Sequence, residues 1–218
     1  MNDIVLIVFD FDGTLAHTLP AVAAGMRRTF HDFGRTPPDE ADVARIIGLP
    51  AAECFTAFAP DLSHEQALVW VEHYRSVYPQ FEGLARLFHG AADTLRLLRQ
   101  AGYALASASN KGEAVLQANA AAFGVSDQFD LLVGDKPGAP AKPDPRVLTE
   151  RVWPRFPQAG PASTLVVGDA VPDMALARAS GARAVLAGWG YGNREACLQY
   201  EPATVLENIR DLPGILKT

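Results

Sequence analysis

Two aspartates, Asp10 and Asp12, follow an apolar run near the start of the sequence. The run, residues 4–9, is rich in β-branched residues and too short for most helices, so it predicts a strand buried on both faces of a parallel sheet. A carboxylate at the carboxyl end of such a strand faces the crevice where open α/β sheets bind ligands. Two carboxylates this close repel each other unless a divalent cation or a retained proton relieves the charge. The alternative is a strand end followed by a turn, where aspartate is common.

A second acidic pair has the same relation to an apolar run. Residues 164–167 predict another buried strand, Asp169 follows after one glycine, and Asp173 lies four residues later at the start of a predicted helix. Because ligands bind outside the carboxyl ends of parallel strands, we expect this pair to meet the first.

A polar segment, Ser109, Asn110 and Lys111, follows the predicted strand 103–108 and precedes a predicted helix. The free N–H groups at a helix N-terminus bind anions, so the segment predicts a phosphate site. Ser107 would face the same side of the strand, and the sequence alone does not decide which of the two serines binds phosphate. We prefer Ser109 because it ends the strand. Ordinary helix capping by the Ser-Asn pair is the alternative.

Lys142 lies in a restricted segment. Pro143 favours an extended conformation at Lys142, and Pro145 starts a predicted helix, so the lysine is expected to be held rigidly. A lone lysine before proline is otherwise most often a solvated loop residue.

The elements that must position these residues alternate along the chain. We expect strands at 4–9, 103–108, 129–133, 164–167 and 182–186, and helices at 91–100, 113–123, 145–153 and 170–180, with a last short helix beginning at 205–209. This alternation predicts a parallel sheet with right-handed crossovers and helices on both faces. The predicted fold class is α/β, a doubly wound, Rossmann-like core.

The segment between residues 15 and 85 has a different pattern, with four helical stretches and no convincing strand. The helices are expected at 18–33, 39–47, 51–58 and 64–78. We therefore predict an α/β hydrolase core of residues 1–15 plus 85–218 and an inserted four-helix cap domain of residues 16–84. An insert at this point can lie over the strand ends as a lid.

The composition excludes several classes of protein. With 218 residues, 49% hydrophobic and 20% charged, the chain can bury a sizeable core, and its net charge of −6 gives no basic footprint for nucleic acid. The first apolar run is too short and wrongly flanked for a signal peptide or membrane span. Cys54 and Cys197 match no metal spacing. We expect a cytoplasmic monomer or homodimer with reduced thiols and no membrane partner.

The chain resembles a known family in four segments that occur in the family's order. They are DFDGTL at 10–15, SNK at 109–111, KPDP at 142–145 and GDAVPDM at 168–174. They resemble the haloacid dehalogenase-like hydrolase superfamily and, within it, the phosphoglycolate phosphatase-like branch, over nearly the whole chain. The resemblance implies a Mg²⁺-dependent phosphatase acting on a small phosphorylated metabolite, with phosphoglycolate as the first candidate.

The resemblance also implies catalytic roles. Asp10 would be the nucleophile that forms an aspartyl-phosphate, and Asp12 would be the general acid and base. Ser109 would hold the phosphoryl oxygens, and Lys142 would neutralise charge. The expected phosphate-binding set comprises Gly13, Thr14, Ser109, Asn110 and Lys142.

The implied metal site uses residues from both acidic pairs. Asp10, the backbone carbonyl of Asp12, and Asp169 would bind Mg²⁺, and Asp173 would support the metal shell. Alternatives are a phosphomutase or a phosphonate hydrolase on the same core, or a non-catalytic protein that binds a phosphorylated ligand. Asp12 favours phosphate chemistry, because the family's dehalogenases displace halide and lack an acid at this position.

The sequence departs from the family pattern at two places. His17-Thr18 stands where close relatives have Asp-Ser, at the expected cap entrance, and Ala170 stands where they usually have Ser or Thr, near the metal shell. The glycine-rich run at 188–192 is either a plain turn or a substrate contact.

Overall fold

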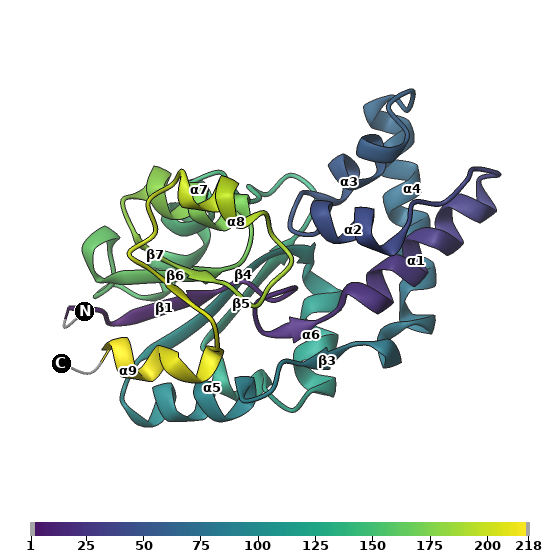
Figure 1. Cartoon of the computed structure of the whole chain (residues 1–218). Coiled ribbons are helices and arrows are strands. Elements are labelled where there is room, and N and C mark those ends of the chain that lie inside the picture. The colour runs from purple at the N-terminus through teal and green to yellow at the C-terminus, as the bar shows by residue number, and fades with distance from the viewer. Residues whose placement is uncertain (1–2, 217–218) are drawn as a thin grey trace.

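Strand β1 (Leu6–Phe9) lies in the middle of a six-stranded parallel sheet with the order β5-β4-β1-β6-β7-β8 (Figure 1). The computed structural model describes residues 3–216, so the outermost ends of the predicted core lie outside the described residues. The other strands are β4 (Ala104–Gly112), β5 (Leu131–Asp135), β6 (Thr164–Gly168), β7 (Arg183–Ala187) and β8 (Thr204–Leu206). The predicted doubly wound α/β fold is confirmed.

Alternate residues of β1 pack against opposite faces of the sheet. Ile7 and Phe9 belong to one apolar cluster, and Leu6 and Val8 belong to the other. The first cluster contains residues of α5 (Ala91–Gln100), α6 (Glu113–Ala122) and α9 (Leu212–Leu216). The second contains residues of the π-helical segment Val147–Val152, α7 (Val171–Ser180) and α8 (Arg194–Leu198). Burial on both faces explains the continuous apolar run that the sequence shows.

The register of the sheet brings the two acidic pairs to one edge. Phe9 lies opposite Val167 of β6, and the Asp10 amide donates a 2.9 Å hydrogen bond to the Val167 carbonyl. The chain moves outward from β1 through β4 and β5, and then returns to β6 on the other side of β1. Ligands bind at such a reversal of strand order. Asp10 and Asp169 therefore flank the switch point.

Four helices follow the first strand and form their own apolar cluster at one end of the molecule, far from both termini (Figure 1). They are α1 (Leu19–Asp32), α2 (Glu40–Ile46), α3 (Ala51–Phe58) and α4 (His64–Val77), followed by two 3₁₀ turns, Tyr78–Gln80 and Glu82–Leu84. Phe30 is central to the cluster, with ring centroids 6.1 Å from Phe55 and 5.0 Å from Trp70. This arrangement is consistent with the predicted cap, whose limits of 16 and 84 stay a prediction.

Several predicted elements were wrong in detail. The segment 205–209 is helical only at its end, since Thr204–Leu206 forms β8 against the open edge of β7, and a 3₁₀ turn, Ile209–Asp211, leads into α9 at Leu212. Two short strands, β2 (Ala16–His17) and β3 (Arg86–Leu87), form an antiparallel ribbon where the sequence showed no strand. Two-residue strands leave no periodicity to detect.

Strand β4 is longer than expected. It continues through Ser109, Asn110 and Lys111 to Gly112, with an irregular register after Ala108, instead of ending at Ala108. The polar segment is therefore extended backbone at the sheet edge, and α6 begins directly after it.

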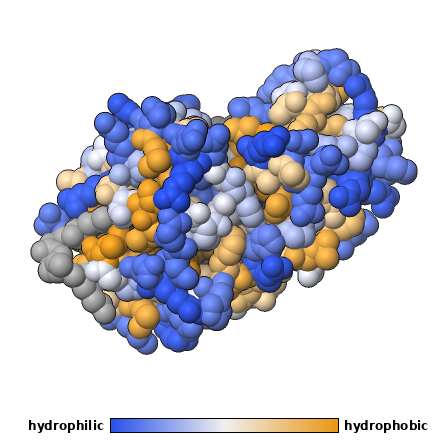
Figure 2. All heavy atoms as spheres, viewed as in Figure 1, coloured by the Kyte–Doolittle hydropathy of each residue, from blue (hydrophilic) through white to orange (hydrophobic). Residues whose placement is uncertain are grey.

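The surface seen in Figure 2 is mostly hydrophilic, and hydrophobic residues are scattered among the polar ones. Within residues 3–216, no helix has the length and apolar character needed to cross a bilayer.

The cluster around Phe30 generates a stability prediction. Because Phe30 is buried among aromatic rings, Phe30→Ala should lower the free energy of unfolding by about 3–5 kcal/mol in urea denaturation. Leu68→Ala, on the exposed face of α4, is the matched control and should change it by less than about 0.5 kcal/mol. Equal losses in the two variants would contradict the packing described here.

Candidate active site

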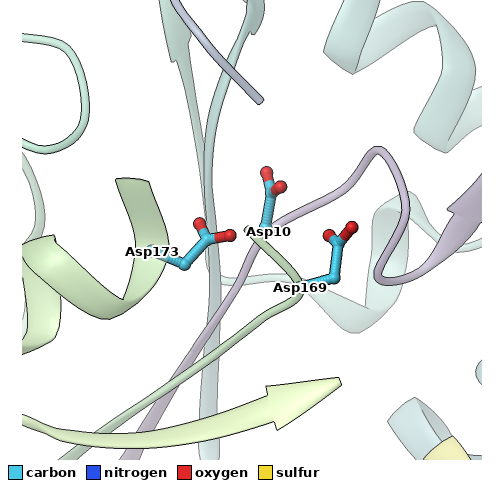
Figure 3. A group of neighbouring side chains, drawn as sticks. All are labelled: Asp10, Asp169 and Asp173. Atoms are coloured by element: carbon cyan, nitrogen blue, oxygen red, sulfur yellow. The ribbon is translucent and has the colours of Figure 1, made fainter. Parts of the chain in front are cut away.

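Three buried aspartates converge at the edge of the sheet (Figure 3). Asp10 follows β1, Asp169 follows β6, and Asp173 lies in the first turn of α7. One carboxylate oxygen of each lies within 4.8 Å of the others. Asp10 of the first acidic pair therefore meets both members of the second pair, and the supporting role expected of Asp173 stays a prediction.

Lys142 is the ammonium that faces this cluster. Its Nζ lies 2.8 Å from Asp10 Oδ1 and donates a 2.6 Å hydrogen bond to Asp173 Oδ1. The side chain is only 2% exposed, so this lysine is not a solvated loop residue. Its approach to Asp10 lacks hydrogen-bond geometry, which leaves Asp10 Oδ1 buried without a hydrogen-bond partner in the described part of the chain.

Burial dominates the electrostatics of the cluster. It raises the pKa of Asp10 to about 8, against the opposing effect of the Lys142 ammonium, and the charges of Asp173 and Asp169 add to the rise. Burial and the Asp173 charge also raise the pKa of Asp169 to about 7. Burial alone would lower the pKa of Lys142, but Asp10 and Asp173 more than offset it and raise the pKa above its ordinary value. Within residues 3–216, three carboxyl groups face one ammonium here, so ionisation of all three would leave excess negative charge.

The cluster fits a hard divalent cation. Mg²⁺ takes oxygen ligands, usually one or two carboxylates together with water and substrate oxygens. Asp10, Asp169 and Asp173 offer close oxygens, and Asp10 Oδ1 accepts no hydrogen bond within residues 3–216 although it lies 2.8 Å from Lys142 Nζ. The donor set and the excess charge therefore both suit Mg²⁺.

Asp169 is fixed by hydrogen bonds from two separate loops. The Thr14 hydroxyl donates to Asp169 Oδ1 at 2.8 Å, and the Tyr191 amide donates to Oδ2 at 2.8 Å. The Gly192 amide adds a longer bond of 3.3 Å to Oδ2. Thr14, which we expected to bind phosphate, thus orients Asp169. Hydrogen bonds of this kind fix the orientation in which the carboxylate oxygens face a metal ion.

Glycines allow these loops to approach Asp169. Gly13 has a positive φ of 80°, and a Cβ there would overlap the Asp169 carboxylate. A Cβ at Gly190 would overlap the Asp169 side chain, and one at Gly192 would overlap the Asp169 carbonyl. The run 188–192 therefore forms a turn that also contacts Asp169, and a contact with substrate stays a prediction. The repeated glycines of this run are visible in the sequence, but the sequence does not show that the run contacts Asp169.

Asn110 joins three segments. Its side-chain nitrogen donates to the carbonyls of Gly48 and Lys142, each at 2.9 Å, and its oxygen accepts from the Lys142 amide at 2.8 Å. Asn110 therefore fixes the backbone of Lys142 and reaches the loop between α2 and α3. The expectation that Asn110 binds phosphate remains a prediction.

Asp12 has a partner that the sequence analysis did not assign. Lys111 Nζ lies 3.2 Å from Asp12 Oδ1 and donates a 3.2 Å hydrogen bond to the Tyr78 hydroxyl. Desolvation of Lys111 is outweighed by Asp12 and Tyr78, which raise its pKa above its ordinary value. Lys111 thus neutralises Asp12 and connects it to the end of the four-helix segment.

The two candidate serines differ in position. Ser107 Oγ is buried and has no hydrogen-bond partner among residues 3–216, whereas Ser109 lines a cavity together with Asp10 and Asp12. Ser109 Oγ accepts a 3.3 Å hydrogen bond from the Lys111 amide. This geometry favours Ser109 as the phosphate-binding serine, which stays a prediction.

The two departures from the family pattern lie where the helices meet the core. His17 Nδ1 is 2.6 Å from the Tyr191 hydroxyl, with the donor set by the histidine tautomer, and Tyr191 also holds Asp169 through its amide. Ala170 is buried, and a Cβ at Gly48 would lie 3.0 Å from the Ala170 side chain. A small residue at 170 lets the loop between α2 and α3 approach the sheet edge.

The acidic cluster generates a pH prediction for the protein in chelator. From about pH 4 the folded state retains protons that the unfolded chain releases, up to about pH 8 on Asp10 and about pH 7 on Asp169. The free energy of unfolding should therefore fall as pH rises, by at most about 1.4 kcal/mol per pH unit for each carboxyl. Urea denaturation from pH 5 to 8 measures it. The slope should be smaller in Asp10→Asn, and an equal slope in both proteins would contradict the assignment.

The glycine contacts generate a second prediction. Gly190→Ala should displace Asp169 and weaken Mg²⁺ binding, measured by calorimetry, by about 10- to 100-fold. Gly160→Ala is the control, because a Cβ there meets nothing within 4 Å. Unchanged Mg²⁺ affinity in a folded Gly190→Ala protein would rule out this role for the loop.

Comparison with known proteins agrees with the geometry. A family model described as haloacid dehalogenase-like hydrolase matches residues 7–187. A phosphoglycolate phosphatase of Mesorhizobium japonicum is 30% identical over 211 residues, 93% of this chain and 90% of that one. The probable phosphatase IndB of Dickeya dadantii is 29% identical over 96% of this chain and 92% of its own length. A crystal structure of a predicted phosphoglycolate phosphatase from Haemophilus somnus superposes over all of both chains with a TM-score of 0.89 and 25% identity. The chain belongs to the haloacid dehalogenase-like hydrolase family.

Proposed function

We propose that this protein is a Mg²⁺-dependent phosphatase that hydrolyses the phosphate monoester of a small metabolite through an aspartyl-phosphate on Asp10. The observation that carries the proposal is the position of Asp10. It is a buried carboxylate at the carboxyl end of β1, next to Lys142 and the second acidic pair, and it lines the same cavity as Asp12 and Ser109. Membership of a hydrolase family and the names of the similar proteins support it.

In the first step, an Asp10 oxygen attacks the phosphorus of the ester. The new Asp10 O–P bond forms as the bond from phosphorus to the leaving alcohol oxygen breaks. A phosphate monoester hydrolyses very slowly without help, so the site must align the nucleophile and offset charge on the other phosphoryl oxygens. Asp10 is buried at the end of β1, so its carboxylate is already held in position before the substrate binds.

Asp12 handles the proton in both steps. It donates a proton to the departing alcohol oxygen in the first step and takes one from water in the second, when that water attacks the aspartyl-phosphate. The second step breaks the O–P bond to Asp10 and releases inorganic phosphate. Asp12 lies two residues from Asp10 and lines the same cavity, which suits both transfers.

Cationic and hydroxyl groups offset the charge of the phosphoryl group. Lys142 is held by Asn110 and by its contacts with Asp10 and Asp173, so its ammonium needs no reorganisation during the reaction. A fixed ammonium in a buried site is worth much more than one in water. Ser109 offers a hydroxyl from the same cavity.

The residues that would hold Mg²⁺ are Asp10, Asp169 and Asp173, with the backbone carbonyl of Asp12 as the family resemblance implies. Bound there, Mg²⁺ supplies charge neutralisation between the anionic nucleophile and the anionic ester. Thr14 and the Tyr191 amide keep Asp169 oriented for that purpose.

The cap assignment is part of the proposal. Residues 16–84 would act as a lid, with joints near 16–18 and 80–83, so that closure excludes water from the site. The β2–β3 ribbon pairs Ala16–His17 with Arg86–Leu87 and so joins the two connections next to the expected joints. Phosphoglycolate is the substrate that the names of the relatives suggest first. Location in the cytoplasm and a monomeric or homodimeric state also remain predictions.

Mutation of the nucleophile tests the mechanism. Asp10→Asn should abolish phosphate release, because it removes the nucleophilic oxygen and a metal ligand with little change of shape. Asp12→Asn should lower kcat by about 10²- to 10⁴-fold, the usual contribution of general acid–base catalysis. Activity is measured as phosphate release from a panel of phosphorylated metabolites with Mg²⁺.

Asp127→Asn, on the surface, is the matched control and should retain full activity. Acid quenching followed by peptide mass spectrometry should find phosphate on the peptide that contains Asp10. Substantial turnover by a folded Asp10→Asn protein, or phosphate on another residue alone, would overturn the mechanism.

A further inference from the structure

The cavity in front of Asp10 has two chemically different ends. Its polar end contains Asp10, Asp12, Ser109 and the Asn110–Lys111 segment. The opposite end is formed by the four-helix segment and is lined mainly by apolar side chains: Val22, Met26, Ile46, Leu49 and Phe55. If the phosphoryl group lies at the polar end, as the proposed function requires, the alcohol part of the substrate must contact these side chains.

The cations that line the cavity already have carboxylate partners. Among residues 3–216 these cations are Arg75 and Lys111. Arg75 lies 2.8 Å from Glu72 Oε1 and 2.7 Å from Asp135 Oδ2, and Lys111 is paired with Asp12. A carboxylate on the alcohol part of a substrate would therefore compete with Glu72 and Asp135 for Arg75, or with Asp12 for Lys111. Burying an unpaired charge is strongly unfavourable.

Leu49 is the clearest sign that the apolar end faces a ligand. It lies in the loop between α2 and α3, lines the cavity, and is not part of the apolar cluster that packs the four helices. The half-buried Leu49 side chain thus contributes an apolar surface to the cavity without serving the packed interior. An apolar side chain in this position gains by contact with an apolar ligand group.

We propose that the substrate is the phosphate monoester of an uncharged, mainly apolar alcohol, whose carbon atoms rest on Leu49 and its apolar neighbours. The inference rests on the proposed phosphatase function and specifies its substrate class. It disfavours phosphoglycolate, because the carboxylate of that molecule would compete with the carboxylates already paired with Arg75 and Lys111.

A pair of esters of similar shape tests the inference. Isobutyl phosphate has the branched outline of phosphoglycolate, with two methyl groups in place of the carboxylate oxygens. With Mg²⁺ present, kcat/KM should be at least about tenfold higher for isobutyl phosphate. In the series from methyl to propyl phosphate, kcat/KM should rise about fourfold for each added methylene.

A substitution at Leu49 tests how charge in the cavity affects the choice of substrate, independently of the intrinsic reactivity of the two esters. Leu49→Lys adds a cation at the apolar end and should lower the preference for isobutyl phosphate over phosphoglycolate by at least about tenfold. Leu49→Met is the matched control and should keep the preference within about twofold of the original. The intrinsic reactivities of the two esters cancel when the preference is compared between proteins, and thermal melting checks that both variants are folded.

The outcomes distinguish the two levels of the argument. Failure to hydrolyse any phosphate ester overturns the proposed function and this inference with it. Hydrolysis in which the unsubstituted protein prefers phosphoglycolate overturns the substrate class and leaves the phosphatase function standing. An unchanged preference in a folded Leu49→Lys protein also overturns the substrate class, and the comparison of esters needs no variant if Leu49→Lys does not fold.

Discussion

The structure depends on an imbalance of buried charge. Asp10, Asp169 and Asp173 converge at the end of the central strand, and Lys142 is the ammonium within contact distance of this group. Burial makes each negative charge costly, which is why the pKa values of Asp10 and Asp169 rise. Such a cluster is stable when it retains protons or binds a cation, and both conditions serve a site that receives an anionic ester. The surrounding fold preserves this imbalance.

The neighbouring loops fix the cluster through one hydroxyl group and several backbone groups. Asp169 is held by Thr14 and by the amides of the glycine-rich loop, and close approach of that loop is possible because Gly190 and Gly192 lack side chains. Asn110 fixes Lys142 in a similar way through both of its backbone groups. Fixed ligands reduce the reorganisation that a reaction requires, so these contacts favour rapid chemistry over a loosely assembled site.

The core and the four-helix segment supply different parts of the cavity. The sheet edge brings carboxylates, an ammonium and a hydroxyl, whereas the helices bring a mainly apolar surface. Lys111 connects the two parts by contacting Asp12 and Tyr78, and His17 connects them by contacting Tyr191. Under the proposed function, this division would let the chemistry stay constant while the apolar surface selects the alcohol, and movement of the helices would change both contacts together.

The sequence by itself determined the fold class and most of the polar residues of the site, because an apolar run that ends in aspartate identifies both a buried strand and its carboxyl end. It did not reveal β8, whose three residues become a strand only by pairing with the open edge of β7. It also could not show that the run 188–192 holds Asp169, or that Lys111 pairs with Asp12, since these contacts join residues 22 and 99 positions apart. The apolar end of the cavity was equally hidden, because helical periodicity indicates which residues are apolar but not whether they face a packed interior or a cavity. Only the tertiary structure decided those contacts, since each depends on how separate segments pack together.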